Sequence, residues 1–467
     1  MSKNIKKKKN KSEKKISHER NKLEEKSKVE NKERKLKKFQ IKLFSEGSIT
    51  QLPDSQRIFG CLMKELNQAA IIDTSNDIDS SGDNWTEEDV TNFVNRVYGD
   101  CEESKQITCM ISGVVPAGYV PTPKAYLMKK IEEKIIPTNQ TVIIAHREEE
   151  NRKFRREIQK WSQEEEVEDD GRIYGEEVLK EMEREREERK KKKLQNILNN
   201  RMKIDANEKV INNISPKTIY ETLKKMDFIE KKELSQLLSR IKNYLMPQKK
   251  STGLGADELK SYKYLTGHQT YLQKISIESD AKNIPGLPNK LFSLPIVELR
   301  NENTKVNKEV KVNRDFCFYV VIEEDTILAK YLAKLAKLIK SEEKYFFLGP
   351  KSSQGYNRYR LLGVSEEKYL EKPGQGIYLN MGMLLPKEDM INWKESDISV
   401  FTSNRRAYDI SDSTDKVISF IDTGSVIAIS ESSKQAKQIG KCIKNKYNVL
   451  YPNAIIFGNS YLEPLEV

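Results

Sequence analysis

Alternating apolar and polar positions near the start of the chain predict a strand followed by a helix. The segment KFQIKLF places an apolar side chain at every second position, which is typical of a strand with one buried face. The next segment, SEGSITQLPD, is polar and forms the first predicted loop. In SQRIFGCLMKELNQ the apolar residues recur at helical spacing, and either Asp54 or Ser55 can cap the N-terminus of the helix. These segments form a first β-α unit.

A second β-α unit begins near residue 314. Its strand is RDFCFYVVIEED, and the following TILAKYLAKLAKLIKSEE carries one apolar stripe at helical spacing. Two further strands, KYFFL and YNRYRLLGV, are joined by a loop. The order strand, helix, strand, loop, strand is that of three-quarters of a ferredoxin-like unit. More strands are predicted later, in VISFI, SVIAI, NVLYP and AIIFG, and the two β-α units suggest a pair of related halves.

A long charged region interrupts the pattern between the two β-α units. The segment QITCMISGVVPAGYVPTPK predicts a short strand that runs into a loop rich in proline and glycine. Residues 146–203 carry acidic and basic side chains four positions apart, with too few apolar residues for a packed core. We therefore predict a solvated insertion that is helical in part. Residues 215–245 show better amphipathic spacing.

Net charge changes this picture at the N-terminus. The 467-residue chain has a formal net charge of +12, which by itself indicates nucleic-acid binding. However, residues 1–42 hold 18 Lys and Arg against 6 Asp and Glu, and the rest of the chain holds 65 of each sign. A polyanion site in the body must therefore be a local patch. We interpret residues 1–37 as a disordered basic tail, with a phosphate-binding arm as the alternative.

Cysteine spacing and hydropathy argue against several classes of protein. The five cysteines are widely spread and include no C-x-x-C pair, which disfavours a disulfide framework and a zinc site. The N-terminal segment lacks the apolar core of a secretory signal, and no apolar run reaches the roughly 18 residues of a membrane span. We expect a cytoplasmic soluble protein that does not engage a membrane.

The loop between the last two strands of the second β-α unit has the composition of a phosphate-contacting loop. Gly349 and Gly355 allow the backbone to approach a ligand closely, Lys351 supplies charge, and Ser352 and Ser353 supply hydroxyls. Flat side chains for stacking unpaired bases follow it, namely Tyr356, Arg358, Tyr359 and Arg360. A long hairpin loop with incidental serines is the alternative. The loop is not a P-loop, because a proline precedes Lys351 and a strand follows, so ATP binding has no support.

Three other residues are candidates for a site. Arg405 and Arg406 are adjacent and can clamp a phosphate, with a solvated pair as the alternative. His268 is the candidate general base for RNA cleavage, although a lone histidine is more often structural. No Ser-His-Asp arrangement and no acidic metal cluster stands out. The sequence therefore indicates binding chemistry, and we expect no catalytic residue, no metal, no cofactor and no small-molecule substrate.

Five landmarks carry a resemblance to the type III CRISPR RAMP proteins of the Csm-four (Cas-five-like) group. The opening strand, loop and helix of that group are similar to FQIKLFSEGSITQLPDSQRIFGCLMKEL, and its next loop is similar to ISGVVPAGYVPTPKAYL. Its glycine-rich loop, late hairpin and terminal strand are similar to FFLGPKSSQGYNRY, DTGSVIAI and YPNAIIFGNSYLEPLEV. The landmarks span Phe39–Lys124 and Asp315–Val467. The glycine-rich loop departs from the family pattern at Pro350 and Asn357, where members carry further glycines.

The resemblance implies an α+β fold with two ferredoxin-like (RRM-like, RAMP) domains that have antiparallel sheets. The N-terminal half would be 38–145 and the C-terminal half 251–467, with a charged, partly helical insertion at 146–250. The protein would be a non-catalytic subunit of a Csm-type interference complex. It would grip the 5′ tag of the crRNA and bridge the large polymerase-like subunit to the backbone RAMP subunits. A thumb hairpin is expected within Tyr262–Leu299.

The RNA-binding residues expected on these grounds lie in the two loops and at three other positions. They are Thr50, Gln51, Ser55, Gln56, Gly349, Lys351, Ser352, Ser353, Gly355, Tyr356, Arg358, His268, Arg405 and Arg406. Two other functions stay open. A RAMP endoribonuclease would process CRISPR repeat RNA with His268 as its base, and an adaptor would dock protein partners through the insertion, with only incidental RNA contact.

Overall fold

The chain forms two compact units, which are called unit 1 and unit 2. Unit 1 is built from the segment that ends at Ala117, from His268–Glu298 and from Asn313–Leu465. Unit 2 is built from Gly118–Gly267 and Leu299–Val312. The computed structural model describes residues 35–75, 85–99, 106–164, 176–202, 211–244, 254–275, 291–301, 311–369, 376–403, 418–430, 439–444 and 455–465.

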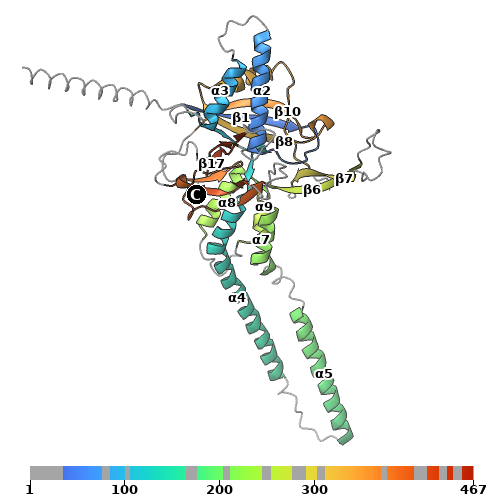
Figure 1. Ribbon diagram of the computed structural model, residues 1–467. Helices are drawn as coiled ribbons and strands as arrows, with labels where there is room; N and C mark the ends of the chain where they lie inside the picture. The colour runs from blue at the N-terminus through green and yellow to red at the C-terminus, as the bar shows by residue number, and fades with distance from the viewer. Residues whose placement is uncertain are drawn as a thin grey trace, which may run out of the picture. The chain divides into compact units, whose positions relative to one another are not determined.

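An antiparallel sheet forms the centre of unit 1 (Figure 1). Its strands are β1 (Leu36–Ser45), β2 (Cys109–Ile111), β3 (Val115–Pro116), β8 (Asp315–Glu323), β9 (Tyr345–Phe347) and β10 (Arg358–Lys368). The strand order is β2-β8-β1-β10-β9, and β3 also pairs with β8. Helix α2 (Ser55–Ser75) follows β1 and helix α10 (Ile327–Leu338) follows β8. The order β2-β8-β1-β10, with these two helices, is that of one ferredoxin-like β-α-β-β-α-β unit.

Both predicted β-α units lie in this one sheet, which corrects the prediction of a separate ferredoxin-like sheet in each half. Strand β1 pairs antiparallel with β8 on one side and with β10 on the other. In this register Phe39 is paired with Val320 of β8 and with Glu366 of β10. The boundaries 38–145 and 251–467 therefore cut through a single sheet. The strand also begins at Leu36, inside the segment assigned to the tail. Local alternation identifies a strand and its buried face, but it does not identify the partner strand.

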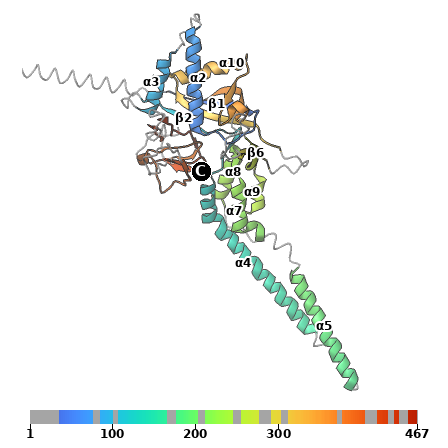
Figure 2. The same cartoon turned by 45° about the vertical axis from the view of Figure 1, so that its right-hand side comes forward.

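Helices α2 and α10 cover one face of the sheet (Figures 1 and 2). The apolar stripe of each helix is buried, as its spacing predicts. The buried stripe residues are Ile58, Leu62 and Leu66 in α2 and Leu328, Tyr331, Leu332 and Leu335 in α10. The carboxylate of Asp54 accepts the backbone N–H of Arg57 at 2.8 Å, so Asp54 caps α2. A further helix, α3 (Glu87–Tyr98), follows α2 and is capped by Thr86.

The C-terminal part of unit 1 contains short strands in three small sheets, β14-β11-β17, β12-β13 and β15-β16. The strands are β11 (Ile377–Asn380), β12 (Val400–Ser403), β13 (Ile418–Ile421), β14 (Val426–Ala428), β15 (Ile443–Lys444), β16 (Ile455–Ile456) and β17 (Leu462–Pro464). The predicted strands VISFI, SVIAI and AIIFG correspond to β13, β14 and β16, whereas NVLYP lies outside the described residues. Backbone hydrogen bonds join this part to β2, because the Ile111 N–H donates to Asn459 at 3.0 Å and the Tyr461 N–H donates to Ile111 at 3.2 Å.

Helices dominate unit 2. Its elements are β4 (Tyr119–Pro121), α4 (Lys124–Glu164), α5 (Glu176–Met202), α7 (Pro216–Lys225), β5 (Phe228–Glu230), α8 (Lys231–Lys242) and α9 (Ala256–Ser261). Strands β4 and β5 belong to a sheet of order β4-β5-β6-β7, completed by β6 (Tyr264–Ile275) and β7 (Leu291–Arg300). The amphipathic segment 215–245 therefore forms two helices, α7 and α8, with a short strand between them.

The described part of the charged region 146–203 is helical and largely exposed, in the second half of α4 and in α5. Acidic and basic side chains one helical turn apart form ion pairs, as the spacing predicts. Glu149 pairs with Lys153 at 3.0 Å and Glu185 pairs with Arg189 at 3.0 Å. Each pair stabilises an isolated helix by only about 0.2 to 0.5 kcal/mol. The described side chains of this charged region therefore lie mostly in solvent rather than in a core.

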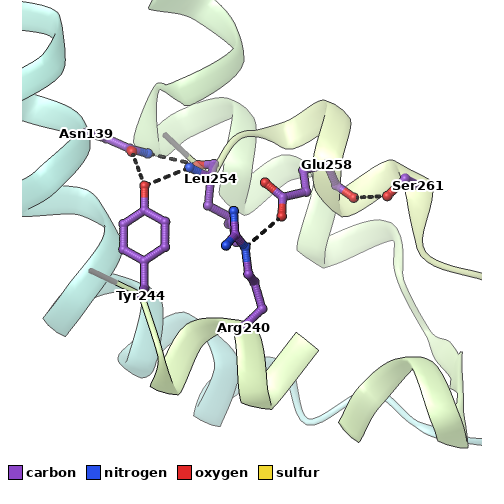
Figure 3. Close-up of polar contacts among 6 residues, drawn as sticks. All are labelled: Asn139, Arg240, Tyr244, Leu254, Glu258 and Ser261. Atoms are coloured by element: carbon purple, nitrogen blue, oxygen red, sulfur yellow. Dashed lines mark hydrogen bonds and ion pairs between the residues drawn. The ribbon is translucent and has the colours of Figure 1, made fainter. Parts of the chain in front are cut away.

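A buried amide holds the helices of unit 2 together (Figure 3). The side chain of Asn139 in α4 is 1% exposed, and its Nδ2 donates to the carbonyl oxygens of Ile214 at 3.2 Å and Leu254 at 2.9 Å. Its Oδ1 accepts the hydroxyl of Tyr244 at 3.5 Å, and that hydroxyl accepts the Leu254 N–H at 2.9 Å. One side chain therefore joins α4 to the segments that precede α7 and α9 and to Tyr244, two residues after α8.

Substituting Asn139 with alanine is expected to lower the free energy of unfolding by about 3 kcal/mol, because two buried carbonyl groups lose their donor. The matched control is Ser261→Ala, because the Ser261 hydroxyl donates to the Glu258 carbonyl oxygen at 2.6 Å at an exposed site of the same cluster. That change is expected to lower stability by about 0.5 kcal/mol or less. Urea unfolding measures both, and equal losses for the two variants would refute the role given to Asn139.

Candidate nucleic-acid interface

The first loop and the glycine-rich loop meet at the side chain of Asn357. The first loop comprises residues 46–54, between β1 and α2, and the glycine-rich loop comprises residues 348–357, between β9 and β10. The Asn357 side-chain oxygen accepts the Thr50 N–H at 2.9 Å. Its Nδ2 donates to the Thr50 hydroxyl at 2.7 Å and to the Pro350 carbonyl at 2.9 Å. Its backbone N–H donates to the Ser48 carbonyl at 3.0 Å. Asn357 is fully buried, so it holds both loops in a single structure.

Close backbone approach explains two glycines at this junction. A Cβ on Gly349 would lie 2.6 Å from Nδ2 of Asn357, so any side chain there would displace the bridging amide. A Cβ on Gly47 in the first loop would collide with the carbonyl oxygen of Gly355. Asn357 itself has a φ of 53°, a left-handed conformation in which asparagine is tolerated better than most residues. Asparagine therefore provides at position 357 the backbone conformation that a glycine would provide, and it adds the bridge.

The tip of the glycine-rich loop is a compact turn with polar groups at its surface. Lys351 has a left-handed φ of 59°, residues Ser352–Gln354 form one turn of 3-10 helix, and Gly355 has a φ of 83°. The N–H groups of Gln354 and Gly355 each donate within the turn at 3.0 Å. Ser353, Gln354 and Gly355 are exposed, and Lys351 and Ser352 are half-buried. The turn thus presents hydroxyl groups and a lysine close to the Asn357 bridge.

A cation from the start of α2 lies on the first-loop side of the junction. The guanidinium of Arg57 donates to the exposed side chain of Gln51 at 2.9 Å. Arg57 is fixed by the capping of α2, since its N–H binds Asp54 and its Nε lies 3.9 Å from the same carboxylate. The sequence prediction named Gln51 and missed Arg57. Its position three residues after the capping Asp54 was the available signal, because the first turn of the helix directly follows the loop.

Two of the predicted site residues turn inward. Ser55 is 0% exposed and its hydroxyl accepts the Met383 N–H at 3.1 Å. Thr50 is 4% exposed and is engaged by Asn357. Both residues therefore support the loop from inside rather than presenting hydroxyl groups to solvent. Gln56 is half-buried in the first turn of α2.

The remaining predicted residues fall into different environments. Tyr356 is half-buried, and Arg358 stacks over the ring of Tyr345 at 3.9 Å. His268 is half-buried in β6, and Arg405 and Arg406 lie outside the described residues. The prediction that Tyr359 stacks on a base is wrong, because its side chain is 0% exposed and its ring packs edge-on against Phe316 at 6.0 Å. This burial raises the pKa of the Tyr359 hydroxyl.

A strand from the segment expected to hold a thumb hairpin also reaches the junction. Strands β6 and β7 are neighbours in one sheet and span the predicted range Tyr262–Leu299. Within unit 1, the N–H of Val297 in β7 donates to the carbonyl of Ile49 at 2.7 Å. The first loop therefore contacts the glycine-rich loop through Thr50, and it contacts β7 through the preceding residue, Ile49.

Neither a protein-family model nor a curated protein sequence matches the chain. Among solved structures, the chain is similar to a chain of a Csm1–Csm4 cassette in complex with pppApA. The identity is 11% over 92% of this chain and 98% of that chain, with a TM-score of 0.40. It is also similar to a chain of a Csm3–Csm4 subcomplex of the type III-A CRISPR-Cas interference complex, at 12% identity over 92% of this chain and 100% of that chain, with a TM-score of 0.39.

At this level of identity and TM-score, the two similarities assign no functional residue and no activity to this chain.

The residues that the structure describes lack two further features. That part of the chain holds no group of three or more His, Cys, Asp or Glu side chains arranged to bind a metal ion. Its helices also include none that is both long and apolar enough to cross a membrane. Cys109, Cys317 and Cys442 are buried, and burial raises the pKa of the Cys442 thiol to about 11.

Proposed function

We propose that this chain is a non-catalytic RNA-binding subunit of a type III CRISPR (Csm-type) complex and that it holds the 5′ tag of the crRNA. The observation that supports this proposal is the Asn357 bridge. It brings the glycine-rich loop to within hydrogen-bond distance of Thr50 in the first loop. The two loops that the sequence landmarks single out, about 300 positions apart in the chain, are therefore one surface.

The chemistry of this surface suits the backbone of a single strand. Phosphate oxygens accept hydrogen bonds from hydroxyl, amide and cationic groups, and such contacts position a nucleic acid. The turn at Lys351–Gly355 offers hydroxyl groups and a lysine, and the first-loop side offers Gln51 and Arg57. Both loops follow the ends of strands of the same sheet, so a strand of RNA crossing the junction meets donors from both sides.

The partners that we propose are those that the sequence resemblance implies, namely the large polymerase-like subunit and the backbone RAMP subunits, in the cytoplasm. We assign the thumb to the hairpin that contains β6 and β7, because β7 contacts the first loop beside Thr50. The exposed charged second half of α4 and the exposed charged part of α5 are then available for docking protein partners. In this proposal His268 has no catalytic role.

Changing Lys351, Ser352 and Ser353 together to alanine is expected to weaken the retention of tagged crRNA by about ten-fold or more, since one charged and two neutral hydrogen-bonding groups are lost. Fluorescence anisotropy with the purified chain and a labelled RNA carrying the tag measures the change. The control is a Lys337→Ala, Ser341→Ala double variant, because both residues are exposed at or just after the end of α10 and belong to neither loop. It is expected to bind as the wild type does.

Two outcomes would contradict the proposal. One is wild-type affinity in the triple variant. The other is cleavage of CRISPR repeat RNA at a single site by the wild-type chain that disappears in His268→Ala, which would instead establish the endoribonuclease.

A further inference from the structure

A second surface adjoins the glycine-rich loop on the face of the sheet opposite α2 and α10. Side chains of consecutive residues in a strand point to opposite faces. Phe346 in β9 and Tyr359 in β10 are 1% and 0% exposed, so they point toward the helices. Their neighbours Tyr345, Phe347 and Arg358 therefore point to the opposite face. Phe347 is 53% exposed, which makes it one of the most exposed aromatic side chains among the described residues.

Strand pairing assembles these side chains into one group. Arg358 is paired with Phe347, and Arg360 is paired with Tyr345 on one side and with Phe44 of β1 on the other. Directly paired residues of antiparallel strands share a face and lie about 4.5 to 5.5 Å apart at Cβ. We call this group the aromatic face. It consists of Phe44, Tyr345, Phe347, Arg358 and Arg360.

Cation–π contacts and ion pairs hold the two arginines against this face. The guanidinium of Arg358 lies 3.9 Å from the centre of the Tyr345 ring, and that of Arg360 lies 5.6 Å from the centre of the Phe44 ring. Glu46 in the first loop pairs with Nε of both, at 3.5 Å for Arg358 and 3.1 Å for Arg360. Each arginine is therefore held in place by an aromatic ring and by Glu46.

Glu343 completes the arrangement at the edge of the sheet. Its carboxylate accepts the Tyr345 hydroxyl at 2.8 Å and lies 3.7 Å from Arg360. The hydrogen bond to Glu343 raises the pKa of the Tyr345 hydroxyl, so the ring stays neutral at physiological pH. Since two carboxylates accompany the two guanidiniums, this face offers stacking surface more than net charge.

We propose that the aromatic face stacks the unpaired bases of single-stranded RNA where the strand leaves the loop junction. The inference rests on the proposed function, because the strand is the one held between the two loops. Continuity of the chain supports it. Phe347 directly precedes the glycine-rich loop, which begins at Leu348, and Arg358 directly follows Asn357, the last residue of that loop.

Single-stranded RNA is the occupant that the composition of the face favours. Aromatic rings and guanidinium planes stack unpaired bases of any sequence, and an exposed sheet face is a platform on which this occurs. Phe347 and Tyr345 are two residues apart on one strand, which places them about 7 Å apart. One splayed base can therefore meet the Phe347 ring, and the next can meet the guanidinium of Arg358, which lies over the Tyr345 ring. Lys42, exposed on the same face of β1 as Phe44, adds a cation for the backbone.

The experiment compares Phe347→Leu with Phe347→Tyr in the full chain. The first change keeps apolar bulk but removes the π face, and the second keeps the ring. We expect Phe347→Leu to weaken binding of a tagged single-stranded RNA about five-fold or more, the lower end of the range for one stacked base, and Phe347→Tyr to bind as the wild type does. Trp393→Ala is the matched control, because Trp393 is a 48% exposed aromatic residue outside this sheet. It is expected to leave affinity unchanged.

A salt series separates this inference from the proposed function. Removal of a phosphate-contacting lysine in Lys351→Ala should lower the slope of log affinity against log salt by about 0.7, whereas Phe347→Leu should leave the slope unchanged. Stacking is also read directly by 2-aminopurine, placed at successive positions of the RNA just beyond the tag. Its fluorescence should be quenched on the wild type and recover on Phe347→Leu.

Each result has one consequence. If the loop variants weaken binding but Phe347→Leu has no effect on affinity or on quenching, the aromatic face is overturned and the loop site stands. If RNA duplex binds as tightly as the single strand, stacking of unpaired bases is overturned as well. If no loop variant affects binding, the proposed function fails first.

Discussion

Replacing Asn357 with alanine is expected to lower the free energy of unfolding by about 3 to 5 kcal/mol and to weaken RNA retention in the same variant. The side chain makes three hydrogen bonds, to the Thr50 N–H, the Thr50 hydroxyl and the Pro350 carbonyl, at a fully buried position. Alanine leaves the Thr50 N–H and the Pro350 carbonyl without this partner. It also places a Cβ at a φ of 53°, where alanine is less favourable than asparagine. Urea unfolding and fluorescence anisotropy measure the two effects.

Two further variants separate the bridge from the backbone conformation. Asn357→Gly restores the left-handed preference but not the hydrogen bonds, so it is expected to be about 1 kcal/mol more stable than Asn357→Ala and still defective in RNA binding. Gln354→Ala, at an exposed position of the same loop, is expected to leave stability unchanged. A glycine variant that binds RNA normally would show that the bridge is not needed to form the interface.

The strands and helices of unit 1 follow from local patterns. Alternation in β1 correctly assigned Phe39, Ile41 and Leu43 to the buried face, and the apolar stripe of α10 is buried as spacing predicts. The arrangement of these elements does not follow from local patterns, because β1 pairs with strands that come about 270 to 330 positions later. Alternation records only that one face is buried. It is equally consistent with a partner in the same half of the chain and with one in the other half.

The candidate site shows the same division between composition and geometry. Glycine, lysine and serine in the loop marked a place of close backbone approach, and the structure gives the reason at Gly349. Composition did not reveal that Asn357 occupies the space a Gly349 side chain would need. The burial of Tyr359 was within reach of pattern analysis, because it alternates with Arg358 and Arg360 and so must point to the other face of the sheet. The inward orientation of Ser55 could not be predicted, since its hydrogen-bond partner Met383 is more than 300 positions away in the sequence.

Lys38 illustrates how far a local pattern can mislead. In the alternation of β1 it occupies a polar position of the face opposite the core, and a solvated lysine is the simplest expectation. In the structure its side chain is 11% exposed, because the C-terminal segment covers that end of the strand. Its ammonium group lies 3.0 Å from Glu367 and 3.9 Å from Glu463. It also lies 4.6 Å from the centre of the Tyr319 ring and 5.2 Å from that of Tyr461.

Substituting Lys38 with alanine is therefore expected to lower the free energy of unfolding by about 2 to 3 kcal/mol, because the buried Glu463 then loses its nearby cation and keeps the Tyr461 hydroxyl, which donates to it at 2.7 Å. The neighbouring Lys37 is the matched control. It pairs with Glu324 at 3.1 Å and Glu366 at 3.3 Å, but its side chain is 30% exposed, so Lys37→Ala is expected to lose about 1 kcal/mol or less. Adding Glu463→Gln to Lys38→Ala should recover part of the loss, since the charge that lost its cation is then removed. Urea unfolding of the single and double variants measures these changes in stability. Lys38 would be an ordinary surface lysine if alanine at positions 37 and 38 lowered the free energy of unfolding equally. The same would hold if the effects of the two substitutions in the double variant were strictly additive.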